Sequence, residues 1–576
     1  MTITIFLIIG VVSLAMVAAF ATPAARRLGL PLPVLLASIG FAYGLSVSVL
    51  GLQPIGIALD SYDAWFVEQL ALDSSTLLIV LLPPLLFEMA LSVDVRRLID
   101  DAAAVLVMAI VAVVAATFAV GVAVWGASDI GLVACLILGA AVATTDPSAV
   151  VSTFREIGAP RRLLIILEGE SLLNDAAAIA LFTLLATLLR GSQDFGVGGV
   201  ALSFLYSFAA GSLTGLTLAF VASRIYPFLG GSSVAETTTT LALAYGAYLL
   251  AELTVGGSGV VAVVFAALAT GSGAFVKMGP GNWARVRTVW DQIGFWANAI
   301  ILPLAASLVP GLFLDLDAGA VFLVVVIYLC ALLARAAILF GVLPILAQLR
   351  VSTPLGQRQK LLVLWGGVRG GVTLVLALSM AELSALGDDA RTLAALAAGY
   401  TLLTLLLNAS TLRVATRLLG LSELSPQDIA LRERIVAGSI ERVRTHVAQL
   451  ALARQLEPAA IAAVDASLVE REDEVREKAA REGGQEAPFA DSLRAGLSII
   501  CGREVRLIRR AFEAGAIGPR ATTALRIASE RIGDATRLGG RKAYETAMLT
   551  SIRPDRRYRL AVFLSFYLSW DGPLRR

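Results

Sequence analysis

Carboxylates stand inside a stretch of chain that is otherwise almost wholly apolar. Between about residues 139 and 180 the sequence carries Thr144-Thr145-Asp146-Pro147, then Glu168-Gly169-Glu170-Ser171, then Asn174-Asp175. A charged side chain at the centre of a bilayer costs at least roughly 2.5–3.5 kcal/mol, so acids in such a place normally mark an ion or proton pathway. Carboxylate, hydroxyl and amide oxygens suit a hard cation, and carboxylates also bind protons. These residue types therefore predict a site that takes a hard cation and protons.

Helical spacing divides the polar residues of this stretch between two faces. Ser171 and Asp175 are four positions apart and share one face, and Glu170 and Asn174 form a neighbouring pair about 100° round the helix. We expect Ser171 and Asp175 to face a cavity together with Asp146. We expect Glu170 to turn toward Arg369, because pairing two buried charges costs less than burying either alone.

Two breaks are predicted in the helices that must position these side chains. Pro147 follows Asp146 within an apolar run, where proline removes a backbone hydrogen bond and clashes with the preceding turn. Near residue 366 a second apolar run is interrupted by Gly366-Gly367-Val368-Arg369-Gly370-Gly371, which is poor helix material. Interrupted segments in corresponding positions of two halves favour an inverted-repeat transporter with its site at mid-membrane.

Composition places these runs in a membrane domain followed by a charged tail. The chain has 576 residues, of which 57% are hydrophobic, and more than half of the Lys and Arg lie beyond residue 420. About thirteen apolar runs are long enough to cross a bilayer. We place them near 2–22, 32–50, 74–92, 102–126, 130–153, 162–190, 198–223, 237–254, 258–273, 288–310, 318–346, 359–382 and 390–416. The predicted class is an all-α polytopic membrane protein, with a membrane domain at 1–420 and a helical C-terminal domain at 421–576.

Charge in the loops predicts the orientation of the chain. Arginines such as Arg26, Arg96 and Arg161 gather on one side of the predicted spans, which makes that side cytoplasmic. The N-terminus is then outside, as an uncleaved first span, and an odd number of spans puts the C-terminal domain in the cytoplasm of a cell whose inner membrane holds the protein. The tail alternates charged and apolar residues at helical spacing, and Ser425-Pro426 predicts a helix start.

The inventory of residues excludes several function classes. The three cysteines are far apart, and His446, the single histidine, lies in the tail, so neither a disulfide framework nor a histidine metal site is expected. The net charge is +2 and the basic residues form no stripe suited to nucleic acid. No nucleophile–base pair is visible in the membrane domain, so we expect neither an enzyme nor a cofactor.

At these residues the chain resembles the monovalent cation:proton antiporters, in particular the sodium/proton exchanger branch with an Asn-Asp motif. The segments that carry the resemblance are Ala143–Pro147, Leu167–Asp175 and Trp365–Gly371, supported by Leu82–Glu88 and Ala251–Leu253. It covers about residues 1–420. It implies two broken helices that cross at mid-membrane, a six-helix core that moves against a dimerising panel, and hence a homodimer in the lipid. The tail matches no motif, so its ligand or partner is unknown.

The resemblance also implies a role for each matching residue. Asp175 resembles the main ion- and proton-binding carboxylate, and Asp146 resembles a second ligand. Thr145 (backbone or hydroxyl) and Ser171 complete the shell. Asn174 resembles the residue of the electroneutral branch, and Glu170 with Arg369 resembles the structural ion pair.

The function expected from all this is secondary active antiport, with sodium transport and pH regulation as its uses. One monovalent cation would exchange for one proton by competition at Asp175; Na⁺ is the expected ion, with Li⁺ and K⁺ as alternatives that spacing along the chain does not distinguish. A K⁺-selective antiporter is the alternative. A cation channel is a further alternative, although no repeated selectivity-filter sequence is visible. For Asp175 and Asp146, the alternative is a role in helix packing alone.

Overall fold

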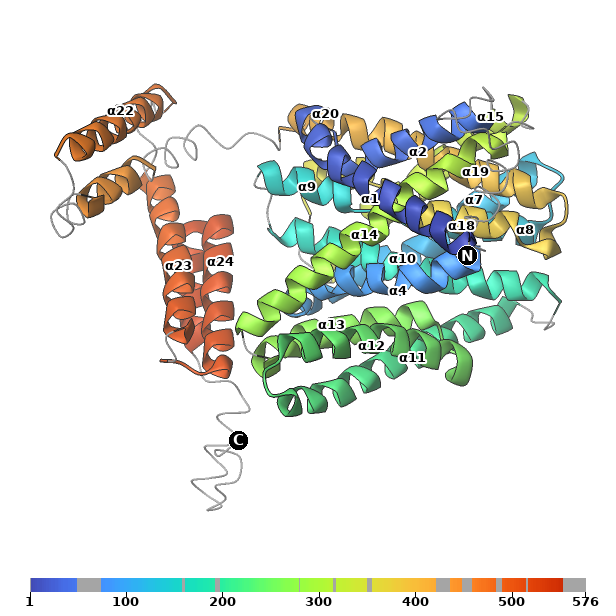
Figure 1. Cartoon of the computed structure of the whole chain (residues 1–576), viewed down its shortest axis with the longest axis horizontal. Coiled ribbons are helices and arrows are strands. Elements are labelled where there is room, and N and C mark those ends of the chain that lie inside the picture. Colours follow the sequence, from blue (N-terminus) through green and yellow to red (C-terminus); the bar gives the residue numbers. More distant parts are fainter. Residues whose placement is uncertain are drawn as a thin grey trace, which may run out of the picture. The chain divides into compact units, whose positions relative to one another are not determined.

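The chain is built from helices in the computed structural model (Figure 1). The structure describes residues 2–28, 30–48, 74–157, 161–191, 197–278, 280–313, 318–349, 355–420, 436–447, 458–482, 489–513 and 516–552. No β-strand occurs among them, which confirms the all-α class. The chain divides into two compact units, Met1–Ser422 and Glu423–Arg576. The helix start predicted at Ser425-Pro426 lies outside the described residues.

The first unit holds the helices of the predicted membrane domain. In chain order they are α1 (Thr2–Leu28), α2 (Leu32–Ser48), α4 (Ser74–Ser92), α5 (Val95–Asp100), α6 (Ala102–Leu106), η1 (Val107–Val111), α7 (Ala112–Ala127), α8 (Leu132–Ala143), α9 (Ser148–Ile157), α10 (Arg161–Leu189), α11 (Val197–Ile225), η2 (Tyr226–Leu229), α12 (Ser233–Leu250), η3 (Ala251–Val255), α13 (Gly259–Met278), α14 (Pro280–Phe313), α15 (Ala318–Ala337), η4 (Ile338–Val342), α16 (Leu343–Gln348), α17 (Gln357–Trp365), α18 (Gly371–Ala381), η5 (Ser384–Leu386), α19 (Asp389–Thr404), η6 (Leu405–Ala409) and α20 (Ser410–Leu418).

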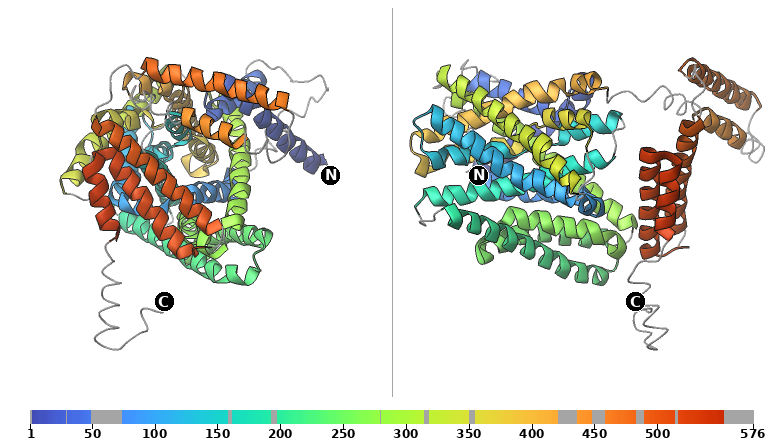
Figure 2. Two further views of the ribbon diagram at one scale, coloured as in Figure 1. Left: turned by 90° about the vertical axis from the view of Figure 1, so that its left-hand side faces the viewer. Right: turned by 180° about the vertical axis from the view of Figure 1, so that it is seen from behind.

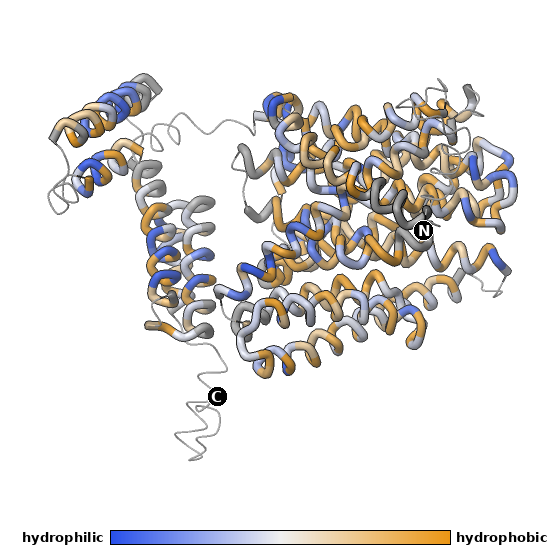
Figure 3. Tube along the Cα trace, in the orientation of Figure 1, coloured by the Kyte–Doolittle hydropathy of each residue, from blue (hydrophilic) through white to orange (hydrophobic). Residues whose placement is uncertain are grey.

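Apolar residues run along most of the length of these helices, and hydrophilic residues gather toward their ends (Figure 3). Within the described residues, six helical stretches are long and apolar enough to cross a membrane. They are Ala102–Ala127, Leu164–Leu189, Gly198–Leu229, Gly281–Leu312, Gly319–Gln348 and Asp389–Leu418. Shorter apolar helices, among them Leu132–Ala143 and Gly371–Ala381, lie at the two breaks. The chain is therefore a multi-pass membrane protein.

Both helix breaks predicted from the sequence are present. The first separates α8 from α9 at residues 144–147, where Pro147 ends the α8 ladder and its carbonyl accepts the Val151 N–H at the start of α9. The second separates α17 from α18 at residues 366–370. α10 packs against α8, and α19 packs against α8, α15 and α18, while α15 also crosses α7 (Figure 2). The two broken helices are thus enclosed by whole ones.

Small residues allow a close crossing between α2 and α14. Gly40 and Gly44 lie one turn apart on α2, and a Cβ atom at either would overlap the backbone carbonyl of Pro303 or Ser307 on α14. Such close backbone approach is the usual source of packing energy between helices in lipid.

The second unit contains two pairs of helices. A helix at residues 436–447 packs beside α22 (Pro458–Glu482), where Arg444 binds Asp465 at 2.9 Å and Glu472 at 3.2 Å. The Arg444 guanidinium lowers the pKa of Asp465 by hydrogen bonding to its carboxylate. The other pair is α23 (Phe489–Glu513) against α24 (Pro519–Ile552), with Cys501 buried between them. The alternating pattern of the tail therefore builds amphipathic helices, as the spacing predicts.

Candidate functional site

A cavity of about 410 Å³ lies beside both breaks in the membrane unit. Its lining includes Asp175 of α10, Asp146 between α8 and α9, and Gly370 between α17 and α18. Glu88 of α4 and Asn298 of α14 line the same cavity. Asp175 and Asp146 therefore lie beside one cavity, whereas Ser171, which was expected to face it with them, is not among the lining residues.

Thr145 ties the first break to α10 through all three of its polar groups. Its N–H donates to Asp175 Oδ1 at 3.2 Å, its carbonyl accepts from the Ser171 hydroxyl, and its Oγ1 accepts from Asn174 Nδ2 at 2.9 Å. Asp175, Ser171 and Asn174 are each at most 3% exposed. Backbone freed by the break therefore finds its partners on the helix that carries the main carboxylate, as a membrane interior requires.

Asn174 acts in this arrangement as a hydrogen-bond donor. Its Nδ2 holds the Thr145 hydroxyl, and its Oδ1 is buried without a hydrogen-bond partner among the described residues. An ionised aspartate at the same position would accept hydrogen bonds only, so the Thr145 hydroxyl would have to donate to it, and the site would gain a negative charge. The amide is thus suited to hold the break without adding charge.

Two contacts join the first break directly to the second. The Asp146 N–H donates to the Val368 carbonyl at 2.8 Å, and the hydroxyls of Thr144 and Thr373 are 2.6 Å apart. Asp146 also caps α9, because its Oδ1 accepts the Ser148 N–H at 2.9 Å. The two breaks therefore cross, and Asp146 lies at the crossing.

Gly370 is the glycine that the crossing requires most directly. A Cβ atom at this position would lie 2.9 Å from Cγ of Asp146 and closer still to its Oδ2. The side chain of Asp146 can occupy its place only while residue 370 has none.

We expect Gly370→Ala to reduce exchange by roughly 10- to 100-fold, since displacing a reacting group by about 1 Å can cost that much. Initial rates of sodium-driven proton flux in proteoliposomes measure the effect. Gly246→Ala on α12 is the matched control, because a Cβ atom there meets nothing within 4 Å. An unchanged rate in Gly370→Ala would show that the position of Asp146 is unimportant.

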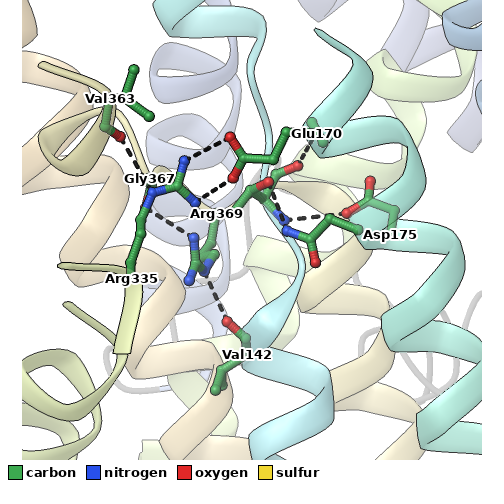
Figure 4. A network of polar contacts seen from close by, with 10 residues as sticks. Val142, Glu170, Asp175, Arg335, Val363, Gly367 and Arg369 are labelled. Atoms are coloured by element: carbon green, nitrogen blue, oxygen red, sulfur yellow. Dashed lines mark hydrogen bonds and ion pairs between the residues drawn. The ribbon is translucent and has the colours of Figure 1, made fainter. Parts of the chain in front are cut away.

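Glu170 forms its ion pair with Arg335 and not, as expected from the sequence, with Arg369. Arg335 on α15 meets Glu170 in two contacts, Nη1 to Oε1 at 2.6 Å and Nη2 to Oε2 at 3.0 Å (Figure 4). Its Nε also donates to the Val363 carbonyl at 3.3 Å. The prediction was wrong because it considered only charges in the matched motifs, whereas the packing of α15 brings a third charge to the same place.

The guanidinium of Arg369 instead donates hydrogen bonds to backbone carbonyls. Its Nε donates to Val142 at 2.8 Å and its Nη1 to Gly367 at 3.1 Å (Figure 4). Its Cζ lies 5.4 Å from the centre of the Tyr400 ring. The residue is 4% exposed. It therefore satisfies carbonyls that both breaks leave free, and among the described residues no carboxylate pairs with it at contact distance.

A signal for Arg335 was present in the sequence. It is a lone arginine inside the long apolar run at 318–346, and an intramembrane charge indicates a functional or paired residue. Applying to this run the rule that singled out Asp175 would have found it.

Comparison with known proteins agrees with this geometry. The model of the family described as "Sodium/hydrogen exchanger, transmembrane" matches residues 12–417. The Na⁺/H⁺ antiporter ApNhaP of Aphanothece halophytica is 31% identical over 401 residues, which cover 68% of this chain and 74% of that one. The Na⁺/H⁺ antiporter NhaG of Bacillus atrophaeus is 28% identical over 369 residues, or 63% of this chain and 66% of the relative.

Among solved structures, the sodium proton antiporter MjNhaP1 of Methanocaldococcus jannaschii has a similar fold, with a TM-score of 0.56. The match covers 72% of this chain and all of that one, at 18% sequence identity. Three observations therefore indicate the same family. They are the crossing of two broken helices beside buried carboxylates, the family model over most of the membrane unit, and these relatives. The chain belongs to the sodium/hydrogen exchanger family.

Proposed function

We propose that this protein exchanges Na⁺ for H⁺ across a membrane and that both ions bind at Asp175. The observation that supports this most directly is a buried carboxylate beside a cavity, held by a hydrogen bond from a break in a membrane helix. Asp146 supplies a second carboxylate, and Ser171 and the carbonyl of Thr145 supply further oxygens. Such oxygens are the ligands that a hard cation prefers.

Exchange follows from the electrostatics of this site. An ionised carboxylate that must cross a low-dielectric barrier is costly unless a cation or a proton neutralises it. Asp175 carries either ion well but not both at once, so sodium displaces the proton and the proton displaces sodium. The empty site stays on one side, and a site that carries either ion can cross. Uncoupled leakage of either ion is suppressed for the same reason.

The charges around the site favour a ratio of one to one. Glu170 and Arg335 neutralise each other as an ion pair. Arg369 has no carboxylate at contact distance, and its charge offsets one of the two aspartates of the site through space. Among Asp146, Asp175 and Arg369 one negative charge then remains, which a single Na⁺ or a single proton neutralises; Glu88 and Glu168 lie further along the same cavity lining. Exchange of one for one moves no net charge.

The test is proton flux in proteoliposomes with sodium, lithium, potassium or choline in turn. We expect flux that saturates with sodium, is absent with choline, and does not change when a membrane voltage is imposed at fixed ion gradients. Potassium as the preferred ion would favour the K⁺-selective alternative. Cation flux without proton counterflow would indicate a channel, and a voltage-dependent rate would contradict the electroneutral ratio.

We infer the orientation from the residues to which the cavity lining extends. The lining extends to Pro31 before α2, Ser92 at the end of α4, and Ser152 on α9. These positions lie near the arginines that mark the cytoplasmic side, such as Arg96 and Arg161, so the site faces inward. We infer thirteen crossings as inverted repeats, with the N-terminus outside and the C-terminal domain in the cytoplasm.

The remaining expectations concern assembly and partners. We propose a homodimer in the cell's inner membrane that acts as a carrier without enzymatic activity and without a bound cofactor. The C-terminal domain is proposed to regulate the carrier.

A further inference from the structure

A face of the last membrane helix carries polar side chains that hold the second break. Thr404, Asn408 and Thr411 lie at helical spacing along α19, η6 and α20. Thr404 Oγ1 accepts the Arg369 N–H at 3.1 Å, Asn408 Nδ2 donates to the Trp365 carbonyl at 2.9 Å, and Thr411 Oγ1 accepts from the Trp365 indole at 3.0 Å. We call Thr404, Asn408 and Thr411 the support face.

The support face forms hydrogen bonds at both ends of the segment 366–370. Asn408 holds the last residue of α17, whose carbonyl lacks a helical partner because the ladder stops there. Thr404 holds the N–H of Arg369, which lies just before α18. A π-helical turn, η6, begins directly after Thr404 and contains Asn408, and such turns occur often at functional sites.

The support face is itself anchored. Tyr328 of α15 donates its hydroxyl to Asn408 Oδ1 at 3.0 Å. Two turns further along α15, Arg335 forms the ion pair with Glu170 of α10. α15 therefore fixes both the helix that carries Asp175 and the helix that holds the second break.

A short path leads from the support face to the site. Thr404 and Asn408 fix the backbone on either side of Val368, and the Val368 carbonyl accepts the Asp146 N–H at 2.8 Å. Neither side chain lines the cavity. The shortest route from the support face to the cation therefore runs through the Val368 carbonyl and Asp146.

We propose that Thr404 and Asn408 are positioning residues, which set the affinity of the site for the cation by fixing the Val368 carbonyl under Asp146. The inference rests on the exchange proposed above. Partners that orient the ligands of an ion typically change its affinity by about 10- to 100-fold when they are removed. The effect should therefore fall on KM for sodium more than on kcat.

The experiment compares two buried threonines of one helix. Thr404→Val keeps the shape of the side chain and removes the acceptor of the Arg369 N–H. Thr401→Val is its control, because the Thr401 hydroxyl is fully buried and bonds only to the Ala397 carbonyl within α19. We expect KM for sodium to rise roughly tenfold in Thr404→Val with kcat within about threefold of the wild type, and both constants to stay within twofold in Thr401→Val.

A second pair keeps the test decisive if Thr404→Val folds poorly. Asn408→Leu removes the bonds to Trp365 and Tyr328, and Thr416→Val removes only a bond to the Leu412 carbonyl in α20. The same rise in KM is expected in Asn408→Leu alone. A wild-type KM in Thr404→Val or Asn408→Leu, or an equal rise in the controls, would overturn the inference. Failure of the proposed function would be a separate result, because exchange would then persist in Asp175→Asn.

Discussion

Replacing Asp175 by asparagine is expected to abolish exchange while the protein folds as before. Asparagine has nearly the same shape, and its Oδ1 still accepts the Thr145 N–H that now binds Asp175 at 3.2 Å. It can neither take up a proton near neutral pH nor neutralise a sodium ion. We expect sodium-dependent proton flux to fall by at least about 100-fold, to the level of empty liposomes.

The measurement is dye-reported proton flux in proteoliposomes, together with the elution profile of the purified variant. Asp388→Asn is a suitable control, because that residue lies exposed before α19 and makes the same chemical change outside the site. Sodium-dependent flux near the wild-type rate in Asp175→Asn would disprove the role of this carboxylate. Competition also predicts that the apparent affinity for sodium falls as the pH falls, because protons then occupy the same group more often.

Breaking the ion pair between Glu170 and Arg335 is expected to have the largest effect on stability. The side chains are 2% and 11% exposed, so removal of one partner leaves the other charge buried and uncompensated. Such a loss costs about 3–5 kcal/mol. We expect both Glu170→Gln and Arg335→Gln to lower the melting temperature in detergent, and the double variant to recover part of the loss because no lone charge remains.

An exposed ion pair provides the comparison. Arg471 and Glu474 of the tail are 70% and 58% exposed, so Glu474→Gln should leave the melting temperature almost unchanged. If the double variant were as unstable as both losses added together, Glu170 and Arg335 would act independently and the pair would not be the source of the effect. Single variants as stable as the wild type would contradict the prediction outright.

The breaks and the carboxylates could be predicted because their causes are local. Pro147 cannot continue a helix, and four glycines around Arg369 weaken one, wherever the rest of the chain lies. The spacing of Ser171 and Asp175 fixed their common face, and both do contact Thr145. Thr145, in the first break, thus contacts the face of α10 that the spacing predicts.

The ion pair could not be predicted in the same way. Glu170 and Arg335 are separated by 165 positions, and no rule of spacing along one helix relates them. Arg335 reaches Glu170 because α15 packs beside the second break, which is a result of tertiary packing. The bonds of Thr404 and Asn408 were missed for the same reason, since hydroxyl and amide groups in apolar runs are common and their partners are distant in the chain.

Two contacts join the interrupted helices where they cross. The Asp146 N–H donates to the Val368 carbonyl, and the hydroxyls of Thr144 and Thr373 form a hydrogen bond. Sliding one interrupted helix past the other would break both contacts, one of which is a main-chain hydrogen bond whose groups would need new partners. The two interrupted helices are therefore expected to behave as one rigid unit. We expect any motion during transport to carry the two helices together, with the change in packing at their contacts with neighbouring helices and not at the contacts between them.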